Sequence, residues 1–453
     1  MEFILALLVI FMVGYLIVKK YQAQGALLLG GGILLILSVL LKGTPIIEKT
    51  VTGSVYLDIF AQLKLDFIKT TGNLGFTIMV VGAFAKYMDT IGASDSLVRF
   101  ATKPLKKLNS PYVVLAFTYV IGQMLNIFIP SAAGLGVLLM VTIYPILVSL
   151  GVSPLAATAV IGTTGCLDLG PASGNAVLAS KIANIDAALY FADYQIPIAI
   201  ATVIVISTLH FIINKRMDNK LRLSGNFDMG AKVQDKEKKD VPLFYALLPI
   251  IPLVSILICS PLTGSKIRLG VIEGMFISIT VSMIIEGTRR KSLKNTLTDL
   301  KIIFGAMGTQ FANIISMVVA GQFFALGLTK IGFISTLIDS TKSAGLGAQA
   351  MIFVMTAIII FSAVIMGSGN APFFAFAALA PAAAASVGIN PIIMLMPMQL
   401  SAGVARSMSP ITSVIVAVTG ISEVSPFDVV KRTAIPMIGG LITIFTMNMI
   451  LFG

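Results

Sequence analysis

Long apolar stretches separated by short polar connections constrain this chain more than any other feature of its sequence. They cover residues 3–18, 26–41, 75–88, 112–129, 136–150, 196–213, 244–259, 269–285, 303–328, 351–366, 371–386 and 435–452. A helix that spans a membrane needs about 20 mostly apolar residues. Charged residues make up only 11% of the chain, against roughly 25% in a soluble domain, and so few charges cannot cover a water-facing surface. We therefore predict an all-α polytopic membrane protein, and exclude a soluble enzyme and a disordered chain.

Positive charge lies between the apolar stretches. The net charge is +12, and basic residues gather in the connections 99–107, 215–239 and 289–301. Loops enriched in Lys and Arg face the cytoplasm, so the charge indicates orientation and argues against a nucleic-acid partner. Glu2 precedes the first apolar stretch and Lys19 and Lys20 follow it, which is the reverse of the order in a signal peptide. The first stretch is therefore predicted to be a permanent helix with the N-terminus outside.

Catalytic and metal-binding signals are absent from the sequence. Cys166 and Cys259 both lie in apolar stretches, which excludes a disulfide scaffold and a thiolate metal cluster. His210 comes shortly before the polar run 214–216, and we expect it to be an interfacial residue at a helix end. The chain has no GxGxxG, Walker-type loop or His-Glu-x-x-His. We expect neither a cofactor nor a metal, and a protein that is not an enzyme.

An internal repeat divides the chain at its one long polar linker. Gly-Val-Ser-Pro at 151–154 recurs as Gly-Ile-Asn-Pro at 388–391, an offset of 388 − 151 = 237. Further pairs at similar offsets are Ser131 with Ser368, Pro171 with Pro410, and Pro197 with Pro436. Matches in the same order at nearly constant spacing indicate duplication. We predict a first repeat at 1–214, a cytoplasmic linker at 215–240 and a second repeat at 241–453.

The charges of corresponding connections differ between the two halves. Residues 99–107 are strongly basic, whereas the counterpart near 330–342 carries only Lys330 and Lys342. Residues 186–193 are acidic, whereas their counterpart ends in Lys431 and Arg432. Corresponding loops are therefore predicted to lie on opposite sides of the membrane. Such inverted-topology repeats are typical of secondary transporters, which bind substrate near the bilayer midplane.

Each half contains two places where an apolar stretch is interrupted by small polar residues. These breaks cover residues 129–136, 168–175, 367–372 and 405–413. Gly, Ser and Asn allow a tight turn and supply hydroxyl, amide and backbone N–H groups. A half-helix that begins at such a turn directs its positive end at an anion. The alternative is that small residues only let helices pack closely; four breaks at corresponding places favour a binding site.

Arg406 lies inside the apolar stretch 391–419, at the fourth break. A charged side chain at a helix centre costs about 2.5–3.5 kcal/mol in a membrane, which indicates a function. A guanidinium forms two parallel hydrogen bonds with a carboxylate, so an organic anion fits better than an inorganic cation. The alternative is an internal ion pair with Asp168 of the second break. Asp168 in turn could carry a proton or help to bind sodium.

The motifs at the breaks resemble those of one transporter family. They are Ser-Ala-Ala-Gly-Leu-Gly-Val-Leu-Leu-Met at 131–140, Gly-Ser-Gly-Asn-Ala-Pro-Phe at 367–373, Arg-Ser-Met-Ser-Pro at 406–410 and Ser-Pro-Phe-Asp-Val-Val-Lys-Arg-Thr at 425–433. From near Tyr21 to the C-terminus the sequence resembles the DcuC-type anaerobic C4-dicarboxylate carriers, and the central linker is least similar. The resemblance implies a bacterial inner-membrane carrier of succinate, fumarate, malate or aspartate. It also implies a homodimer in which a mobile domain moves like an elevator.

The resemblance places substrate-binding residues at two re-entrant hairpin tips and two unwound helices. They are Ser131, Ala132, Ala133, Gly134, Ser368, Gly369 and Asn370 at the tips, and Ser173, Gly174, Asn175, Arg406, Ser407, Ser409, Thr412 and Ser413 in the unwound helices. Some relatives are expected to have an acidic residue near Asn175. Here the nearby acid is Asp168, which is the candidate for binding a coupling ion.

The sequence predicts succinate efflux or dicarboxylate exchange. Asp168 is the one acidic residue well placed near the breaks, which leaves few ligands for sodium and favours exchange or proton coupling. One alternative is ion-coupled uptake of an amino acid or another carboxylate on the same scaffold. A more remote alternative is a membrane-embedded enzyme or a channel.

Overall fold

The computed structural model describes residues 2–19, 21–43, 45–47, 50–224, 241–260, 263–333, 336 and 347–453. All regular secondary structure in these ranges is helical. Seven helical stretches within them are long and apolar enough to span a membrane: Ala23–Lys42, Pro111–Phe128, Ala187–Leu223, Val271–Arg290, Leu293–Lys330, Ala348–Met366 and Pro426–Phe452. The prediction of an all-α fold with many candidate spans is confirmed.

The first half contains long helices, a helical hairpin and a broken helix. In chain order the elements are α1 (Glu2–Val18), α2 (Ala23–Lys42), α3 (Asp58–Thr70), η1 (Thr71–Gly75), α4 (Phe76–Thr90), α5 (Ala93–Thr102), η2 (Lys103–Lys107), α6 (Pro111–Phe128), α7 (Ala132–Thr142), α8 (Tyr144–Ser149), α9 (Pro154–Thr163), α10 (Gly174–Ile182), α11 (Ala187–Leu189), η3 (Tyr190–Gln195) and α12 (Ile196–Leu223). Proline occupies the first position of α6 and α9, where its missing N–H and fixed φ favour the start of a helix.

The second half contains the same kinds of element. In chain order they are η4 (Leu243–Ile250), α13 (Ile251–Ile258), α14 (Val271–Arg290), α15 (Leu293–Thr298), α16 (Leu300–Gln310), η6 (Phe311–Ile315), α17 (Ser316–Lys330), α19 (Ala348–Met366), α20 (Asn370–Phe376), η7 (Ala377–Leu379), α21 (Ala380–Ser386), α22 (Pro391–Arg406), α23 (Ser413–Ser422) and α24 (Pro426–Phe452).

The order of elements in the first half recurs in the second. Helices α6 and α7 form a hairpin, as do α19 and α20, and each hairpin is followed by a broken helix, α9–α10 or α22–α23. The π-helical turns η1 and η6 stand 311 − 71 = 240 positions apart, close to the offset of the sequence repeat. The orientation of the two halves in a membrane and their limits at 1–214 and 241–453 stay predictions.

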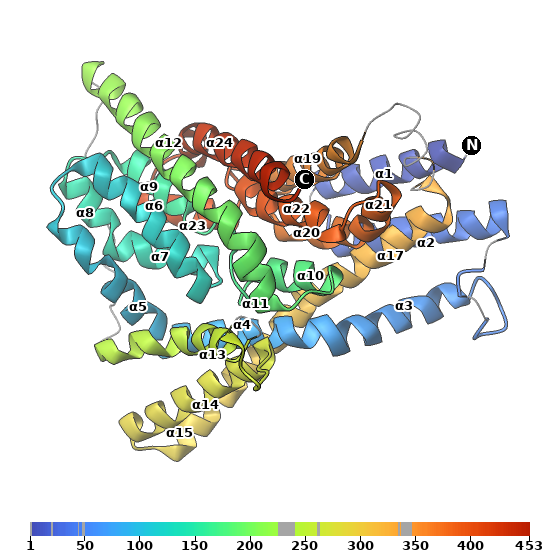
Figure 1. Cartoon of the computed structure of the whole chain (residues 1–453), viewed down its shortest axis with the longest axis horizontal. Helices are drawn as coiled ribbons and strands as arrows, with labels where there is room; N and C mark the ends of the chain where they lie inside the picture. The colour runs from blue at the N-terminus through green and yellow to red at the C-terminus, as the bar shows by residue number, and fades with distance from the viewer. Residues whose placement is uncertain are drawn as a thin grey trace.

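Long helices from different halves pack against each other. Helix α12 lies along α24, α2 along α17, and α4 along α16 (Figure 1). Where α2 crosses α17, a Cβ atom on Gly31 would lie only 3.0 Å from the backbone nitrogen of Phe324. Glycine therefore lets these two helices approach closely, as is common in membrane proteins. The two halves interlock instead of forming separate lobes.

Helix α12 is longer than the apolar pattern predicts. It continues to Leu223 and so includes residues 215–223 of the predicted linker, while 225–240 lie outside the described residues. His210 is fully buried, with its Nε2 atom 3.0 Å from the Thr163 hydroxyl. Asn214 donates a hydrogen bond of 3.0 Å to the His210 carbonyl oxygen. The prediction that His210 is an interfacial residue at a helix end is wrong, because the helix runs on and other helices cover it.

A buried ion pair fastens α12 to α24. Arg432 and Asp218, exposed by 1% and 0% at their side chains, are 2.7 Å apart. The Asp218 carboxylate also accepts hydrogen bonds from the Ser153 hydroxyl at 2.6 Å and the Tyr112 hydroxyl at 3.0 Å. One carboxylate thereby joins α6, the start of α9, α12 and α24. A buried ion pair needs such additional hydrogen bonds to offset its desolvation.

Candidate functional site

Of the four breaks, two form hairpin tips and two interrupt a helix; the first of the two helix breaks, at 168–175, lies between α9 and α10. Asp168 and Gly170 have φ values of +49° and +87°, a left-handed conformation that glycine adopts freely and aspartate tolerates. The Gly170 N–H donates to Gln195 Oε1 at 3.0 Å, and the Ser173 hydroxyl accepts from the Ala176 N–H at the start of α10. The backbone thus turns sharply at Asp168, where the sequence predicts a break, and resumes a helix with Ser173 as its N-cap.

The second break lies between α22 and α23. The Thr412 hydroxyl donates to the carbonyl oxygen of Arg406, and the Thr433 hydroxyl donates to that of Ser407 at 2.9 Å. These hydroxyls satisfy carbonyl groups that the end of α22 leaves without helical partners. Ser407 and Ser409 are also buried, but the Ser409 hydroxyl has no hydrogen-bond partner in the part of the chain that the structure describes.

Both hairpins turn at a serine that caps the next helix. The Ser131 hydroxyl accepts a hydrogen bond from the Gly134 N–H at 3.1 Å, at the start of α7. The Ser368 hydroxyl accepts one from the Ala371 N–H at 3.4 Å, at the start of α20. Gly367, with φ +65°, ends α19 and allows the second turn. The two serines therefore stabilise the hairpin tips through the backbone.

Side chains from three of the four breaks meet at Asp168. Arg406 Nη2 donates to Asp168 Oδ1 at 3.0 Å and to the Gly165 carbonyl oxygen at 2.8 Å. Asn175 Nδ2 donates to Asp168 Oδ2 and to Asn370 Oδ1, each at 3.0 Å. A chain of polar contacts therefore runs from the second broken helix through the first to the tip of the second hairpin.

Glycines bring the backbones of these segments together. A Cβ atom on Gly403 would collide with the Cys166 carbonyl oxygen and lie 2.8 Å from Asp168 Oδ2. A Cβ atom on Gly369 would collide in the same way with the carbonyl oxygen of Ala402. The first hairpin reaches the cluster through Ala132, whose Cβ would lie 2.9 Å from a Cβ on Gly165. All four breaks thus lie at one place in the fold.

The remaining predicted substrate-binding residues lie at the margins of the Asp168 cluster. Ser413 is exposed, and no hydrogen bond among the described residues joins it or Ser131 to the Asp168 cluster. A Cβ atom on Gly134 would face Asp89 of α4 at 3.8 Å, whereas one on Gly174 would face Phe374 of α20 at 3.9 Å. Ala133 is partly buried on α7 beside Gly134. These residues shape the hairpin and helix starts without touching Arg406.

Two buried glutamines that the sequence analysis missed hold the first break in place. Gln399 Nε2 donates to the carbonyl oxygens of Leu167 and Asp168 at 3.4 and 3.3 Å. Gln195 Nε2 donates to Gln399 Oε1 at 2.8 Å, and the Tyr190 hydroxyl donates to the same oxygen at 3.2 Å. The sequence feature that could have identified Gln399 is its position inside the apolar stretch 391–419, since a buried amide requires hydrogen-bond partners.

Several buried polar atoms of the cluster have no hydrogen-bond partner among the described residues. They are Arg406 Nε, Asn175 Oδ1 and Ser409 Oγ. Both hydrogen bonds that the guanidinium makes with other described residues use Nη2. Its Nε–H is buried, and a carboxylate would reach it, in a fork, only when the cluster opens. No group of three His, Cys, Asp or Glu side chains in the described part of the chain lies close enough to hold a metal ion. The arrangement suits an organic anion.

Replacing Gly403 by alanine should destabilise this cluster. The new methyl group would force α22 away from the first break, and overpacking of this kind costs about 1–3 kcal/mol. We expect a lower midpoint of thermal unfolding in detergent. Gly420→Ala is the matched control, because nothing lies within 4 Å of a Cβ atom at that position. Equal midpoints for the two variants would contradict the close approach at Gly403.

Comparisons with known proteins agree with the resemblance seen in the motifs. The family model "DcuC: C4-dicarboxylate anaerobic carrier" matches residues 1–453. The probable anaerobic C4-dicarboxylate transporter DcuC of Vibrio cholerae is 34% identical over 100% of this chain and 98% of its own length. The anaerobic C4-dicarboxylate transporter DcuC of Escherichia coli K12 is 35% identical over 98% of this chain and 95% of its own.

Two solved transporter structures share the fold. The YdaH transporter of Alcanivorax borkumensis has a TM-score of 0.59 at 16% identity, and covers 94% of this chain and 98% of its own. MtrF of Neisseria gonorrhoeae has a TM-score of 0.65 at 15% identity, and covers 95% of each chain. At these identities the likeness concerns the fold alone.

Proposed function

Because the chain belongs to the DcuC family of anaerobic C4-dicarboxylate carriers, we propose that it carries succinate, fumarate, malate or aspartate across the bacterial inner membrane. The family and its full-length relatives are transporters. The chain is therefore a multi-pass membrane transporter and not an enzyme.

The position of Arg406 carries the proposal for the substrate. A dianion that enters the membrane loses hydration, and only fixed donors or positive charge can replace it. Arg406 offers its unpartnered Nε edge to one carboxylate at the meeting point of the four breaks. Asn175, on the first turn of α10, is hydrogen-bonded to Asp168, and Asn370 is hydrogen-bonded in turn to Asn175. Their amides and the positive end of α10 would hold the second carboxylate.

Asp168 supports exchange as the mode of transport. Its carboxylate accepts hydrogen bonds from both Arg406 and Asn175, so it neutralises the guanidinium and competes with a substrate carboxylate. A bound dicarboxylate would displace Asp168, which then remains as the candidate for a coupling proton. The same feature favours the alternative of amino acid uptake, because a displaced Asp168 would accept hydrogen bonds from an ammonium group.

The proposed transport cycle uses the duplicated architecture. Helices α20 and η7 of the second hairpin pack against α17, and in an elevator cycle this contact would break as the site moves. The π-helical turns η1 and η6, at an offset of 240, support a duplicated architecture, whose two repeats are inverted in this proposal. A homodimer completes the proposal, as the resemblance implies.

Inverted repeats predict opposite labelling of two exposed positions, Asp186 at the N-cap of α11 and Lys431 near the start of α24. Asp186→Cys should react with a membrane-impermeant maleimide from outside the cell, and Lys431→Cys only after the cytoplasmic side is opened. Both positions are exposed. Cys259 is replaced by serine as background, while Cys166 is buried and stays. Labelling of both positions from the same side would rule out the inversion.

Counterflow in proteoliposomes tests the transport proposal. Vesicles loaded with unlabelled succinate should accumulate labelled succinate from outside. An excess of external fumarate, malate or aspartate should suppress this uptake, whereas butyrate, which has one carboxylate, should not. Exchange should continue when choline replaces sodium at constant pH and ionic strength. No accumulation with any of the four acids, or suppression by a neutral amino acid such as leucine, would overturn the proposal.

The tip of the second hairpin should contribute modestly to affinity. Asn370→Ala removes an amide that is placed to donate to a carboxylate, and Ser368→Ala weakens the cap that orients the tip. A neutral hydrogen bond is worth about 0.5–1.5 kcal/mol, so each change should weaken succinate binding by about 2- to 12-fold. Isothermal calorimetry measures this directly. Asn295→Ala, on an exposed turn of α15, is the control, and native affinity in both tip variants would remove the second hairpin from the site.

A further inference from the structure

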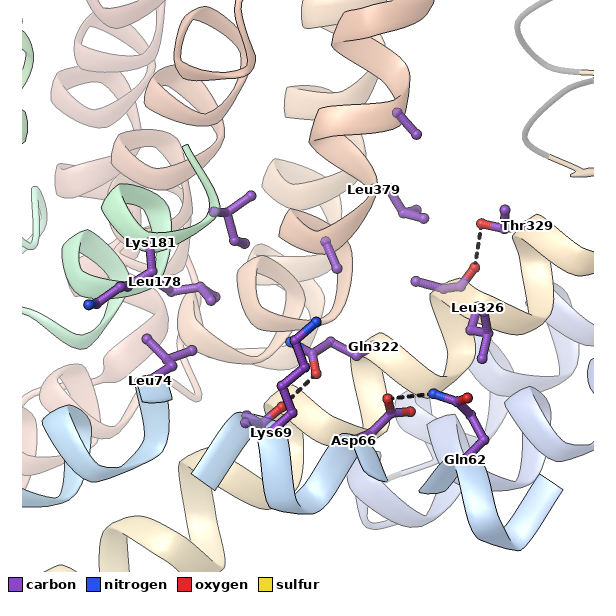
Figure 2. Close-up of a pocket in the computed structure, with 15 residues that line it drawn as sticks. Gln62, Asp66, Lys69, Leu74, Leu178, Lys181, Gln322, Leu326, Thr329 and Leu379 are labelled. Atoms are coloured by element: carbon purple, nitrogen blue, oxygen red, sulfur yellow. Dashed lines mark hydrogen bonds between the residues drawn. The ribbon is translucent and has the colours of Figure 1, made fainter. Parts of the chain in front are cut away.

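Figure 2 shows a cavity of about 520 Å³ whose lining includes no residue of the Arg406 cluster. It is bounded by α3, α10, α17 and the second arm of the second hairpin, and its floor is made of leucine, isoleucine and alanine side chains. Its volume falls within the range of small-molecule sites, about 300–1,000 Å³. Its polar lining comprises Gln62, Asp66, Lys69, Thr70, Lys181 and Gln322 together with one threonine of α17.

The cavity has one lysine on each of two opposite walls, Lys69 on α3 and Lys181 on α10. Neither Lys69 nor Lys181 makes a hydrogen bond or an ion pair within 4.0 Å among the described residues. Figure 2 shows Lys69 of α3 extending beside Gln322, and Lys181 on α10 across the cavity with its nitrogen turned outward. Both lysines are exposed, and a lysine stem is flexible enough to redirect its ammonium group.

The neighbouring hydrogen bonds orient this lining. The Thr70 hydroxyl donates to Gln322 Oε1 at 2.8 Å, which leaves the Gln322 amide nitrogen as a donor. Gln62 Nε2 donates to Asp66 Oδ1 at 2.8 Å, so Asp66 has a partner other than lysine. Two lysines and one aspartate give the cavity a net charge of 2 − 1 = +1. An anion is therefore the ligand that this lining favours.

The cavity adjoins the proposed transport site. Helix α10 carries Asn175 at its site end and Lys181 six residues later, which is about 9 Å along a helix. The second hairpin likewise leads from Asn370 through η7 to the cavity. The Asn175–Asn370 hydrogen bond of 3.0 Å joins α10 to the hairpin tip between the two places.

We infer that this cavity is a second, weaker binding site for the dicarboxylate, which holds the substrate before it reaches Arg406. This inference rests on the proposed function. Once the flexible Lys181 stem turns inward, the ammonium groups of Lys69 and Lys181 would face a ligand with two separated negative groups, whereas a single phosphodiester group would engage only one of them. Substrate is captured here through charge and is released inward when the Asn175–Asn370 contact opens.

The test compares a double variant with a matched lysine variant in proteoliposomes. Lys69→Gln/Lys181→Gln should lower kcat/KM for succinate exchange by roughly 5- to 20-fold at low salt, since charged clefts raise capture rates by at least 10-fold. The value of kcat should change less than about twofold. Salt at about 0.5 M should remove most of the difference, because it screens exposed charges. Lys64→Gln, an exposed lysine of the same helix α3 outside the cavity, should behave as wild type.

A variant with the opposite change of charge, and the results that would contradict the inference, complete the test. Asp66→Asn removes the one negative charge of the lining and should raise kcat/KM at low salt by about 2- to 5-fold. If the wild-type protein exchanges no dicarboxylate, the proposed function fails. If the wild-type protein exchanges dicarboxylates but the double variant has the same kcat/KM as Lys64→Gln, only the inference of a second site fails. The wild-type protein could also exchange succinate only in phosphatidylglycerol vesicles and not in phosphatidylcholine vesicles. If the double variant loses this dependence on lipid, the cavity binds a lipid headgroup and the inference is overturned.

Discussion

Replacing Arg406 by glutamine is expected to weaken succinate binding to the purified protein by at least about 100-fold. A hydrogen bond to a charged group contributes about 1.5–3 kcal/mol, and a forked pair therefore contributes at least about 3 kcal/mol, which is roughly two orders of magnitude in affinity. Arg406→Lys keeps the charge but loses the planar fork, and should still lose about 10-fold. Isothermal calorimetry on protein that elutes as a single species in gel filtration measures both.

Asp168→Asn separates binding from ion pairing. Asp168 is the partner of Arg406 in the structure, at 3.0 Å, and a neutral amide removes this competitor while keeping the side-chain shape. Affinity for succinate should stay within about threefold of wild type or become tighter. Native affinity in a folded Arg406→Gln protein would mean that the guanidinium only neutralises Asp168.

Replacing Asp218 by alanine is expected to cause the largest loss of stability. The carboxylate is fully buried, and it accepts hydrogen bonds from Arg432 at 2.7 Å, from Tyr112 at 3.0 Å and from both the hydroxyl and the N–H of Ser153. Removing one member of a buried ion pair leaves an uncompensated charge and costs about 3–5 kcal/mol. Unfolding of the purified protein in mixed micelles with increasing sodium dodecyl sulfate measures this change.

An exposed ion pair on α24, the helix that carries Arg432, supplies the control. Asp428 and Lys431 are 2.7 Å apart but are exposed by 46% and 70% at their side chains. Such surface pairs contribute about 0–1 kcal/mol, so Asp428→Ala should unfold almost as the wild type does. If Asp218→Ala is no less stable than Asp428→Ala, the buried cluster does not hold α12, α24 and the start of α9 together.

The helical fold and the four breaks could be predicted from local sequence. Apolar stretches of membrane-spanning length are a sufficient signal for helices, and Gly, Ser and Asn inside such stretches mark where the helix cannot continue. Residues 164–173 and 407–412 lie outside regular helices, as the interruptions in 154–183 and 391–419 predict. The pairing of Arg406 with Asp168 was one of two alternatives, because a single charge inside a membrane requires some partner.

The contacts that could not be predicted join residues far apart in the chain. Asn214 and Asp218 belong to a polar run that is typical of a solvated linker, yet both are buried, because Arg432, which lies 214 residues beyond Asp218, packs against them. Gln195 and Gln399 likewise form one buried pair across 204 positions. A local pattern of polar residues does not reveal whether such a distant partner exists.

Competition binding tests most directly whether the meeting point of the four breaks is a dicarboxylate site. Labelled succinate is bound to the purified wild-type protein in detergent, and unlabelled fumarate, malate, aspartate or butyrate is added as the competitor. We predict that the three dicarboxylates displace succinate. Butyrate has only one carboxylate and lacks hydrogen bonds worth at least about 1.5 kcal/mol, so it should require at least about 10-fold higher concentrations. Displacement by butyrate at the same concentrations as fumarate would contradict a site built for two carboxylates.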